Sequence, residues 1–429
     1  MQQHKTDHKT DPETFWTAVR RDHPDYIRWF VADTASALGA SLISIPMAMV
    51  SLHVTGSLSQ AGLVGAATSL GSMIMTIPAG MIIDRFNKKR LLFLYGLSLF
   101  LIWAGFSALL VWGVLSFPLL LLFGLSAGLI TGTFGGLTNA ILRFIIGEKL
   151  LVAAQGRNQT RDSIVWMAGL PLGGLLYGIA PVIPFVAQAV AGLGPICAAK
   201  TIEANLEQPG TRSTYSFEEF WADTKYSLTW IWKYPTLRAV FGVDLFANFA
   251  NFFFIAAVDL WLAYLQVEGW IIGLVSATFS IGMVVGGLVQ DRLIRLFPAS
   301  RIIWVTMLWQ LGCYLFLVAF SQYWPLIAVA TFAVSIPAVA WMSYSGGYLV
   351  LSAPPEKIGK CSAGARLMMG LMPVLASAGA GVMLSAVGFR LSMAVCAACA
   401  AVAWFISTSQ VLRRLPKAAD FDQLPVYDG

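Results

Sequence analysis

Charged side chains are scarce in this sequence of 429 residues: Asp, Glu, Lys and Arg together make up 12%, whereas 57% of the residues are hydrophobic. Soluble globular domains carry about 25% charged residues, so this composition excludes a soluble globular protein. The net charge of +6 is therefore no sign of nucleic-acid binding, and we expect no nucleic-acid partner. The composition instead predicts a protein that lies in a lipid bilayer.

The sequence also lacks the signatures of enzymes and of nucleotide-driven machines. No Walker-type phosphate loop occurs, and the loops are too short for a nucleotide-binding domain. Residues 124–128 (GLSAG) match the nucleophile pattern of hydrolases, but that chemistry needs a strand-to-helix turn and a histidine base. His4, His8 and His23 lie near the N-terminus, and His53 lies at the outer end of the first apolar segment. We therefore predict no enzyme, no metal site and no cofactor.

A secretory signal and a disulfide framework are missing as well. The N-terminal segment is polar and has no apolar core, so the first span itself must direct insertion. The five cysteines (Cys197, Cys313, Cys361, Cys396 and Cys399) lie in apolar segments or in a cytoplasmic loop, so no disulfide is expected. Cys396 and Cys399 form a C-x-x-C pair inside an apolar helix, which indicates small buried side chains.

Apolar segments of the length that crosses a bilayer, about 17–25 residues, recur along the chain. With a cytoplasmic N-terminus, every Lys and Arg except Arg390 falls on the cytoplasmic side, as the positive-inside rule requires. We predict an all-α membrane protein with twelve transmembrane helices in two six-helix halves, located in the plasma membrane (the inner membrane of a bacterium) with both termini cytoplasmic. The predicted spans are 27–52, 58–83, 91–113, 115–142, 162–180, 182–199, 237–264, 269–290, 301–321, 324–352, 364–387 and 389–412.

One long polar interruption separates the two halves. Within it, Phe217, Phe220, Trp221, Leu228 and Ile231 recur at roughly helical spacing among charged residues, which predicts an amphipathic helix on the membrane surface that tethers the halves. The predicted organisation is an N-terminal cytoplasmic segment (1–26), a first half (27–199), a cytoplasmic linker (200–236), a second half (237–412) and a cytoplasmic tail (413–429).

A charged hairpin occurs once in each half, where a span leaves lipid for water. Glycines beside it are expected to let two membrane helices approach closely. A motif repeated in both halves predicts a duplicated protein whose halves move against each other. The first copy comprises Gly71, Gly80, Asp84, Arg85, Lys88 and Lys89, and the second comprises Gly287, Asp291 and Arg292.

Glycines also recur every four residues within several spans, which predicts close helix packing. Whether these surfaces serve only static packing or also let helices slide is left open by the sequence. The stripes are Gly124, Gly128, Gly132 and Gly136 in the fourth span, Gly169, Gly173, Gly174 and Gly178 in the fifth, and Gly282 and Gly286 in the eighth.

The first hairpin resembles the loop between the second and third spans of the major facilitator superfamily, and the resemblance extends over residues 27–412. Further segments are similar to its branch of drug:proton antiporters, which contains macrolide, tetracycline and enterobactin exporters. These segments are 36–40 (SALGA), 55–57 (TGS), 62–65 (GLVG), 169–174 (GLPLGG) and 232–238 (WKYPTLR).

The resemblance implies a monomeric secondary active transporter that rocks two halves around a central site, and the branch implies proton-coupled export of a drug-like or siderophore-like molecule. Asn87, which tolerates the left-handed conformation, replaces the turn glycine of the first hairpin, and Thr278 replaces the upstream glycine of the second. The fourth-span arginine motif that accompanies proton coupling has no clear copy. Uptake or facilitated passage of a small organic solute therefore stays open, as does a non-transporting receptor or a lipid scramblase on the same fold.

Carboxylates within the spans are candidate coupling residues, because burying an ionised one costs about 2.5–3.5 kcal/mol on insertion scales. Asp33 and Asp244 occupy similar places in the two halves, a few turns inside the first and seventh spans. We predict that Asp33 binds the coupling proton or a cationic substrate, with Asp244 as its counterpart. The alternative is that each is a structural partner of a nearby arginine.

Two more aspartates lie near span ends. Asp162 follows Arg161 at the predicted start of the fifth span. Asp162 is expected to cap the helix or, like Arg161, to join the cytoplasmic gate. Asp259, near the outer end of the seventh span, is expected to form a hydrogen bond or to belong to a gate.

The resemblance implies that Asp84 and Arg85 form part of the cytoplasmic gate. An aspartate in this loop can cap a helix N-terminus in the opposite half, and the expected partner is the start of the eleventh span, around residues 362–366. Polar and aromatic side chains of the second half are expected to line a cavity for a large amphipathic substrate. They are Asn248, Asn251, Gln310, Trp341 and Tyr344.

Overall fold

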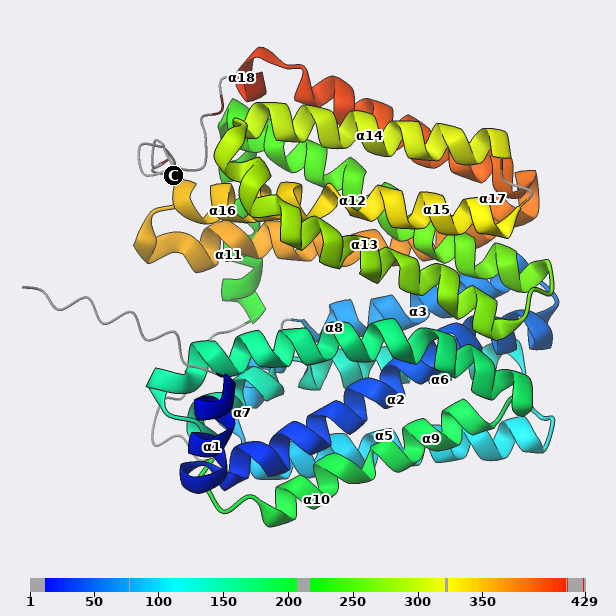
Figure 1. The fold of residues 1–429 in the computed structure, drawn as a ribbon, viewed down its shortest axis with the longest axis vertical. Helices are drawn as coiled ribbons and strands as arrows, with labels where there is room; N and C mark the ends of the chain where they lie inside the picture. The colour runs from blue at the N-terminus through cyan, green and yellow to red at the C-terminus, as the bar shows by residue number, and fades with distance from the viewer. Residues whose placement is uncertain are drawn as a thin grey trace, which may run out of the picture.

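The computed structural model describes residues 12–76, 78–206, 217–320 and 323–413 together with Leu415 and Tyr427, and nearly all of these are helical (Figure 1). Within this part, ten helices are long and apolar enough to cross a membrane, and α3 with α4 forms a bent pair that makes an eleventh span. The 50-residue helix α17 contains Gly388 in a non-helical conformation (φ 73°, ψ 180°), so it consists of two spans. The predicted all-α fold of twelve spans is confirmed.

The first half begins with the short amphipathic helix α1 and contains six spans. Its helices are α1 (Pro12–Asp22), α2 (Pro24–Thr55), α3 (Leu58–Met75), α4 (Pro78–Arg85), α5 (Lys88–Val111), α6 (Phe117–Phe134), α7 (Leu137–Ile145), α8 (Glu148–Ile179), α9 (Ile183–Ala191) and α10 (Leu193–Thr201).

Helix α11 connects this half to the second. The remaining helices are α11 (Phe217–Lys233), α12 (Pro235–Tyr264), α13 (Gly269–Leu296), α14 (Ala299–Phe320), α15 (Trp324–Ser335), α16 (Ala338–Ser352), a 3₁₀ turn (Pro355–Lys357), α17 (Ile358–Ser407) and α18 (Gln410–Arg413).

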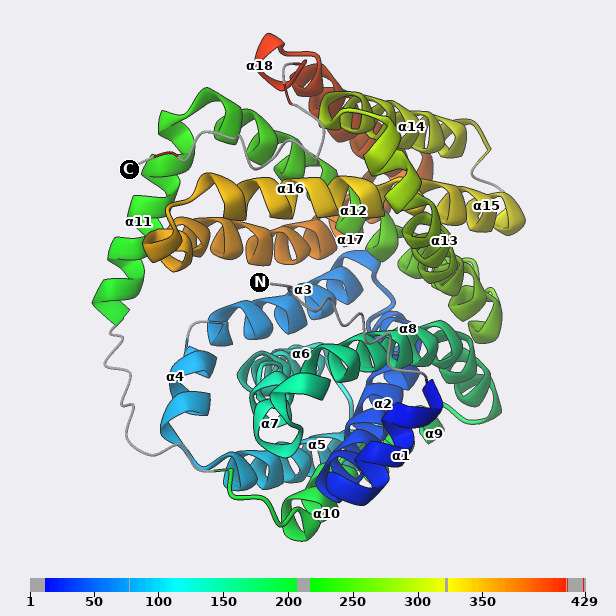
Figure 2. The ribbon, with the colours of Figure 1, turned by 60° about the vertical axis from the view of Figure 1, so that its left-hand side comes forward.

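The two halves form two layers, with α2 to α10 in one and α12 to α17 in the other (Figure 1, Figure 2). We call the side that carries α1 and α11 the proximal side and the opposite side the distal side. Arg390 lies beyond Gly388 on the distal side and donates to the Val318 carbonyl at 2.9 Å. The other described Lys and Arg residues lie towards the proximal side, which is the asymmetry that the sequence predicts.

Several spans differ in detail from the predicted ones. The fourth span breaks between α6 and α7 at Gly135 and Gly136, and the tenth breaks between α15 and α16 at Pro337. The fifth span is one helix that begins at Glu148, well before the predicted start at residue 162. Asp162 therefore lies inside α8, and the prediction that it caps this helix is wrong, because the backbone N–H groups there are already bonded within the helix.

Asn87 begins α5 as a helix cap and not as a left-handed turn residue. Its φ is −60°, and its side-chain oxygen accepts hydrogen bonds from Lys89 N at 2.8 Å and Arg90 N at 3.4 Å. The tolerance of asparagine for the left-handed conformation is therefore not used here, and an N-cap explains why asparagine suits this position. The left-handed conformation occurs at Gly56 (φ 62°), which ends α2.

The glycine stripes mark close helix contacts at most of the predicted places. A Cβ atom on Gly128 of α6 would overlap the Thr68 carbonyl of α3, and one on Gly71 of α3 would overlap the Leu125 carbonyl of α6. A Cβ on Gly80 or Gly287, by contrast, would meet nothing within 4 Å. The predicted close approach at these two hairpin glycines is therefore wrong, because both lie where the helix faces open space.

The fifth-span glycines contact two different helices. A Cβ on Gly169 would overlap the Ser41 side chain, and one on Gly173 would overlap the Leu42 backbone, so both lie against α2. Gly174 instead faces Gly269 of α13, in the other half. This stripe therefore packs helices within one half and joins the two halves.

The linker forms the predicted amphipathic helix, α11, which packs against the proximal end of α17. Trp230 and Ile231 are buried, whereas Trp221 and Leu228 are exposed. Ser227 Oγ donates a hydrogen bond of 2.5 Å to the Cys361 carbonyl, so α11 is fixed to the second half.

Gly128→Ala tests the packing of α6 on α3. We expect the free energy of unfolding to fall by about 1–3 kcal/mol, because the added methyl group has to displace backbone atoms. Gly105→Ala is the matched control, since a Cβ on this helical glycine of α5 meets nothing within 4 Å. Thermal unfolding of the purified variants in detergent measures both, and equal melting temperatures would contradict the close contact.

Candidate functional site

The two halves contact each other closely on the distal side. A Cβ on Gly62 of α3 would come within 2.7 Å of Gly381 Cα of α17. Ser377 Oγ of α17 donates to the Gly62 carbonyl at 3.2 Å, and the Ser59 and Ser385 hydroxyls share a hydrogen bond. Together with the contact between α8 and α13, these pairs form a distal seam. Because the side chains at these contacts are small, the helices of the two halves lie close together and the distal side is closed.

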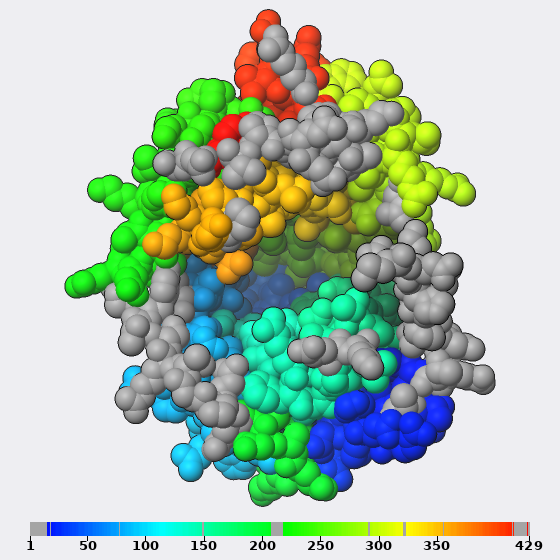
Figure 3. Space-filling view, turned by 90° about the vertical axis from the view of Figure 1, so that its left-hand side faces the viewer, coloured from blue at the N-terminus to red at the C-terminus, as the bar shows by residue number. Residues whose placement is uncertain are grey.

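On the proximal side the halves stand apart. Figure 3, viewed from this side, shows the surface hollowed between α16 of the second half and the helices α6 and α8 of the first. A cavity of about 480 Å³ in this opening is lined by both halves. The first half contributes Met73, Thr76, Gly80, Met81 and Asp84, and the second contributes Gly359, Lys360, Ala363, Arg366 and Leu367.

Asp33 belongs to a charged cluster of three helices. Its carboxylate forms an ion pair with Arg161 of α8 and accepts a hydrogen bond of 3.0 Å from Thr138 Oγ1 of α7. Arg161 is only 9% exposed and also donates to Asp162 Oδ1 at 2.7 Å. Its guanidinium lies 5.0 Å from the centre of the Phe30 ring, which adds a cation–π contact. One guanidinium thus serves two carboxylates, and the cluster carries a formal charge of −1.

Asp33, Arg161 and Asp162 can each be singled out from the sequence, but their association cannot. The sequence predicts Arg161 and Asp162 as gate residues and Asp33 as a coupling residue. The sequence gives no sign that α8 begins as early as Glu148. This early start places Arg161 well inside a helix, at the depth of Asp33. The structure therefore pairs Asp33, the predicted coupling residue, with Arg161. This is the alternative stated above, in which Asp33 is the structural partner of a nearby arginine.

Asp244 of α12 has neutral neighbours. It lies next to Ser345 and Trp341 of α16, although the Trp341 indole nitrogen has no hydrogen bond of ordinary geometry. Asn248, one turn further along, donates to the Asp244 main-chain carbonyl at 2.8 Å. Asp33 and Asp244, which the sequence predicts at similar places in the two halves, thus have different electrostatic surroundings.

The other predicted substrate residues lie on α12, α14 and α16, and most of them are buried. Trp341 and Tyr344 are each 3% exposed and pack in the core of the second half, where Tyr344 Oη donates to the Ile294 carbonyl at 3.4 Å. Gln310 of α14 is 4% exposed. Asn251 of α12 is partly buried.

The residues of the first hairpin have different surroundings. Asp84 and Arg85 are exposed, and Asp84 forms no ion pair with the described residues. It faces the start of α17 across the proximal cavity, the partner that the sequence predicts. Lys88 is buried with its ammonium group 5.0 Å from the Phe144 ring centre, and Lys89 Nζ donates to the Glu203 carbonyl at 3.5 Å.

The second hairpin lies at the proximal end of α13. Arg292 is exposed there and Gly287 is partly buried, and a Cβ on Gly287 would meet nothing within 4 Å. The side chain of Asp291 lies outside the described part of the chain. The role predicted for this hairpin, in a protein whose halves move against each other, therefore stays a prediction.

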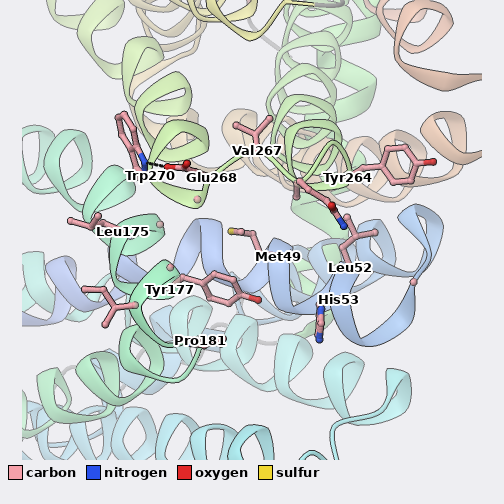
Figure 4. Close-up of a pocket in the computed structure, with 17 residues that line it drawn as sticks. Met49, Leu52, His53, Leu175, Tyr177, Pro181, Tyr264, Val267, Glu268 and Trp270 are labelled. Atoms are coloured by element: carbon pink, nitrogen blue, oxygen red, sulfur yellow. Dashed lines mark hydrogen bonds between the residues drawn. The ribbon is translucent and has the colours of Figure 1, made fainter.

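A larger pocket of about 890 Å³ opens on the distal side of the seam (Figure 4). Tyr177 extends from α8 towards Met49 and His53 of α2, and Trp270 donates a hydrogen bond of 2.5 Å to Glu268 at the start of α13. Tyr177, Glu268 and Trp270 belong to no motif in the sequence, because they lie at helix ends that no periodic pattern marks.

This chain matches one protein family by sequence and several solved structures by fold. The family model of the major facilitator superfamily matches residues 30–270. No protein of curated function matches by sequence. A crystal structure of the nucleoside transporter NupG covers 89% of this chain and 97% of its own, with a TM-score of 0.68 at 12% identity.

Two further crystal structures are similar. That of a D-xylose-proton symporter covers 92% of this chain and 99% of its own, with a TM-score of 0.69 at 15% identity. That of a bacterial homologue of the iron transporter ferroportin, in an inward-facing state, covers 90% and 98%, with a TM-score of 0.65 at 12% identity. At such identities the likeness establishes the fold alone. The family match spans more than half of the sequence, and the chain belongs to the major facilitator superfamily.

Proposed function

We propose that this protein is a secondary active transporter that exports a drug-like or siderophore-like organic molecule in exchange for protons, by alternating access. The observation that carries the proposal is the cluster of Asp33, Arg161 and Asp162. Because two carboxylates share one guanidinium, a single proton neutralises the cluster and weakens the hold of Arg161 on α2. Protonation would thereby change a contact between helices of the first half.

The proposed inward-facing state follows from charge and shape. Under the positive-inside rule the proximal side is cytoplasmic, so a chain closed at the distal seam and hollow on the proximal side is in an inward-facing state. The cavity of about 480 Å³ lies within the usual range of about 300–1,000 Å³ for small-molecule sites. A proton entering along a potential of 100 mV supplies about 2.3 kcal/mol.

The proposed cytoplasmic gate joins Asp84 to the start of α17. In the outward-facing state these elements would meet, and the Asp84 carboxylate would interact with the positive end of the α17 dipole. Their position on opposite walls of the proximal cavity supports this proposal. Arg85, Lys88, Lys89 and the second hairpin with Arg292 belong to the same proposed gate.

Uptake of a small organic solute is the second candidate. Two of the similar structures are those of a nucleoside transporter and of a D-xylose-proton symporter. The direction of substrate movement relative to protons separates the two candidates.

Proton flux tests the proposed function. The protein is reconstituted into liposomes with an internal pH dye, and candidate substrates are added under an imposed pH gradient. We expect substrate-triggered proton movement in the wild type and its loss in Asp33→Asn, with Asp244→Asn impaired as well. The exposed Asp22→Asn is the matched control. Substrate crossing without protons would indicate a facilitator, and coupling that survives in both variants would reject these sites.

A double-mutant cycle tests the charged cluster. Arg161→Gln should lower the free energy of unfolding by about 3–5 kcal/mol, because it leaves a largely buried carboxylate without its partner. Adding Asp33→Asn should restore most of this loss. Thermal unfolding in detergent gives the coupling energy, and additive losses would show that the ion pair contributes little.

Thiol labelling tests the gate. In a variant without native cysteines, Ala363→Cys reports access to the proximal cavity. We expect Asp84→Asn to increase the labelling rate from the proximal side, because the neutral side chain stabilises the closed gate less. Glu356→Gln, on the same cavity wall as Ala363, is the control. An unchanged rate in Asp84→Asn would rule out the latch.

A further inference from the structure

A second, smaller cavity of about 160 Å³ lies between the halves, next to Asp259 of α12. Its walls come from both halves: Ser44 of α2 and Trp166 and Leu170 of α8 on one side, and α12, α13 and α15 on the other. Leu170 is also part of the distal seam, because a Cβ on Gly273 of α13 would overlap its carbonyl. The cavity therefore lies directly beneath the contact that closes the distal side.

The polar atoms that face this cavity are nearly all oxygens. Ser276 Oγ donates to Asp259 Oδ1 at 2.5 Å, and Thr331 Oγ1 donates to the Ile327 carbonyl at 2.7 Å. With their protons committed, both hydroxyls have only lone pairs left for a further ligand. Ser280 lies one turn beyond Ser276 on the same face of α13 and lines the cavity too. The only N–H group among the lining side chains is the indole of Trp166.

No Lys, Arg or His is among the described residues that line the cavity. Asp259 forms no ion pair in the described part of the chain, unlike Asp33. A carboxylate taken out of water is costly unless a cation or strong hydrogen bonds compensate for its charge. Among the described residues that line the cavity, the second carboxylate oxygen of Asp259 has neither a cation nor a hydrogen-bond donor as a partner.

We propose that this cavity binds one hard monovalent metal cation, with Na⁺ as the ion of matching charge, held by the Asp259 carboxylate and the hydroxyl oxygens of Ser276, Ser280 and Thr331. Carboxylate, hydroxyl and water oxygens are the ligands of hard cations. One carboxylate balances one positive charge. A cavity of about 160 Å³ also leaves room for several waters, each of which takes about 30 Å³.

The position of the site links cation binding to the conformation of the protein. Because its walls come from α2 and α8 as well as from the second half, the site is complete only while the distal seam is closed. A bound cation would therefore stabilise the distally closed state. This consequence rests on the proposed alternating access, whereas cation binding itself does not.

Binding of ²²Na⁺ to the purified full-length protein, measured by scintillation proximity without substrate or pH gradient, tests the site. We expect saturable binding to the wild type that Asp259→Asn abolishes and Ser280→Ala weakens several-fold. The matched control is Thr278→Ala. Thr278 lies on the same helix, but its hydroxyl donates to the Val275 and Ala328 carbonyls and does not line the cavity.

A melting curve provides the second measurement. Replacing choline chloride by NaCl at equal ionic strength should raise the melting temperature of the wild type and of Thr278→Ala, as ligand binding to the folded state requires. The rise should be absent in Asp259→Asn and smaller in Ser280→Ala, which keeps the carboxylate. Absence of bound ²²Na⁺ in the wild type, or equal binding by Asp259→Asn, would overturn the proposal. Failure of proton-coupled export would leave these results unaffected.

Discussion

The two six-helix halves are in backbone-to-backbone contact at the distal end and stand apart at the proximal end, and this asymmetry governs the rest of the architecture. Lipid supplies no hydrophobic force between helices, so such contacts depend on close van der Waals packing. The pairs Gly62 with Gly381 and Gly174 with Gly269 provide it. These contacts lie at one end of the halves, and the hollow lies at the other end.

The second constraint is the cost of placing charge in a low-dielectric interior. Three aspartates lie in this interior, each with different surroundings. Asp33 is paired with Arg161, Asp244 lies beside the neutral Ser345 and Trp341, and Asp259 accepts from Ser276 next to a cavity. These environments give the aspartates different chemistry in spite of their similar sequence settings. The paired Asp33 suits a site that exchanges protons, and the oxygen-lined cavity at Asp259 suits a metal cation.

Much of the fold could be predicted because the bilayer acts on each segment separately. The length of apolar runs predicts the spans, and the placement of Lys and Arg predicts that the loops alternate between two sides. Breaks in the spans were missed because Gly135 and Pro337 stand in otherwise apolar runs, where packing against neighbours decides whether a helix bends. The early start of α8 was missed for the opposite reason: residues 148–161 are polar, although they continue the helix.

The class of protein, the twelve spans, the duplicated hairpin and the set of carboxylates within the spans can all be derived from the chain alone, since each depends on local composition and length. Which of these residues meet depends on the packing of the helices in three dimensions. Arg161 reaches Asp33 across 128 positions of sequence, and the Asp259 cavity collects side chains from α2, α8, α12, α13 and α15. Such contacts depend on how helices rotate and cross, and neither periodicity nor spacing in a single chain contains that information.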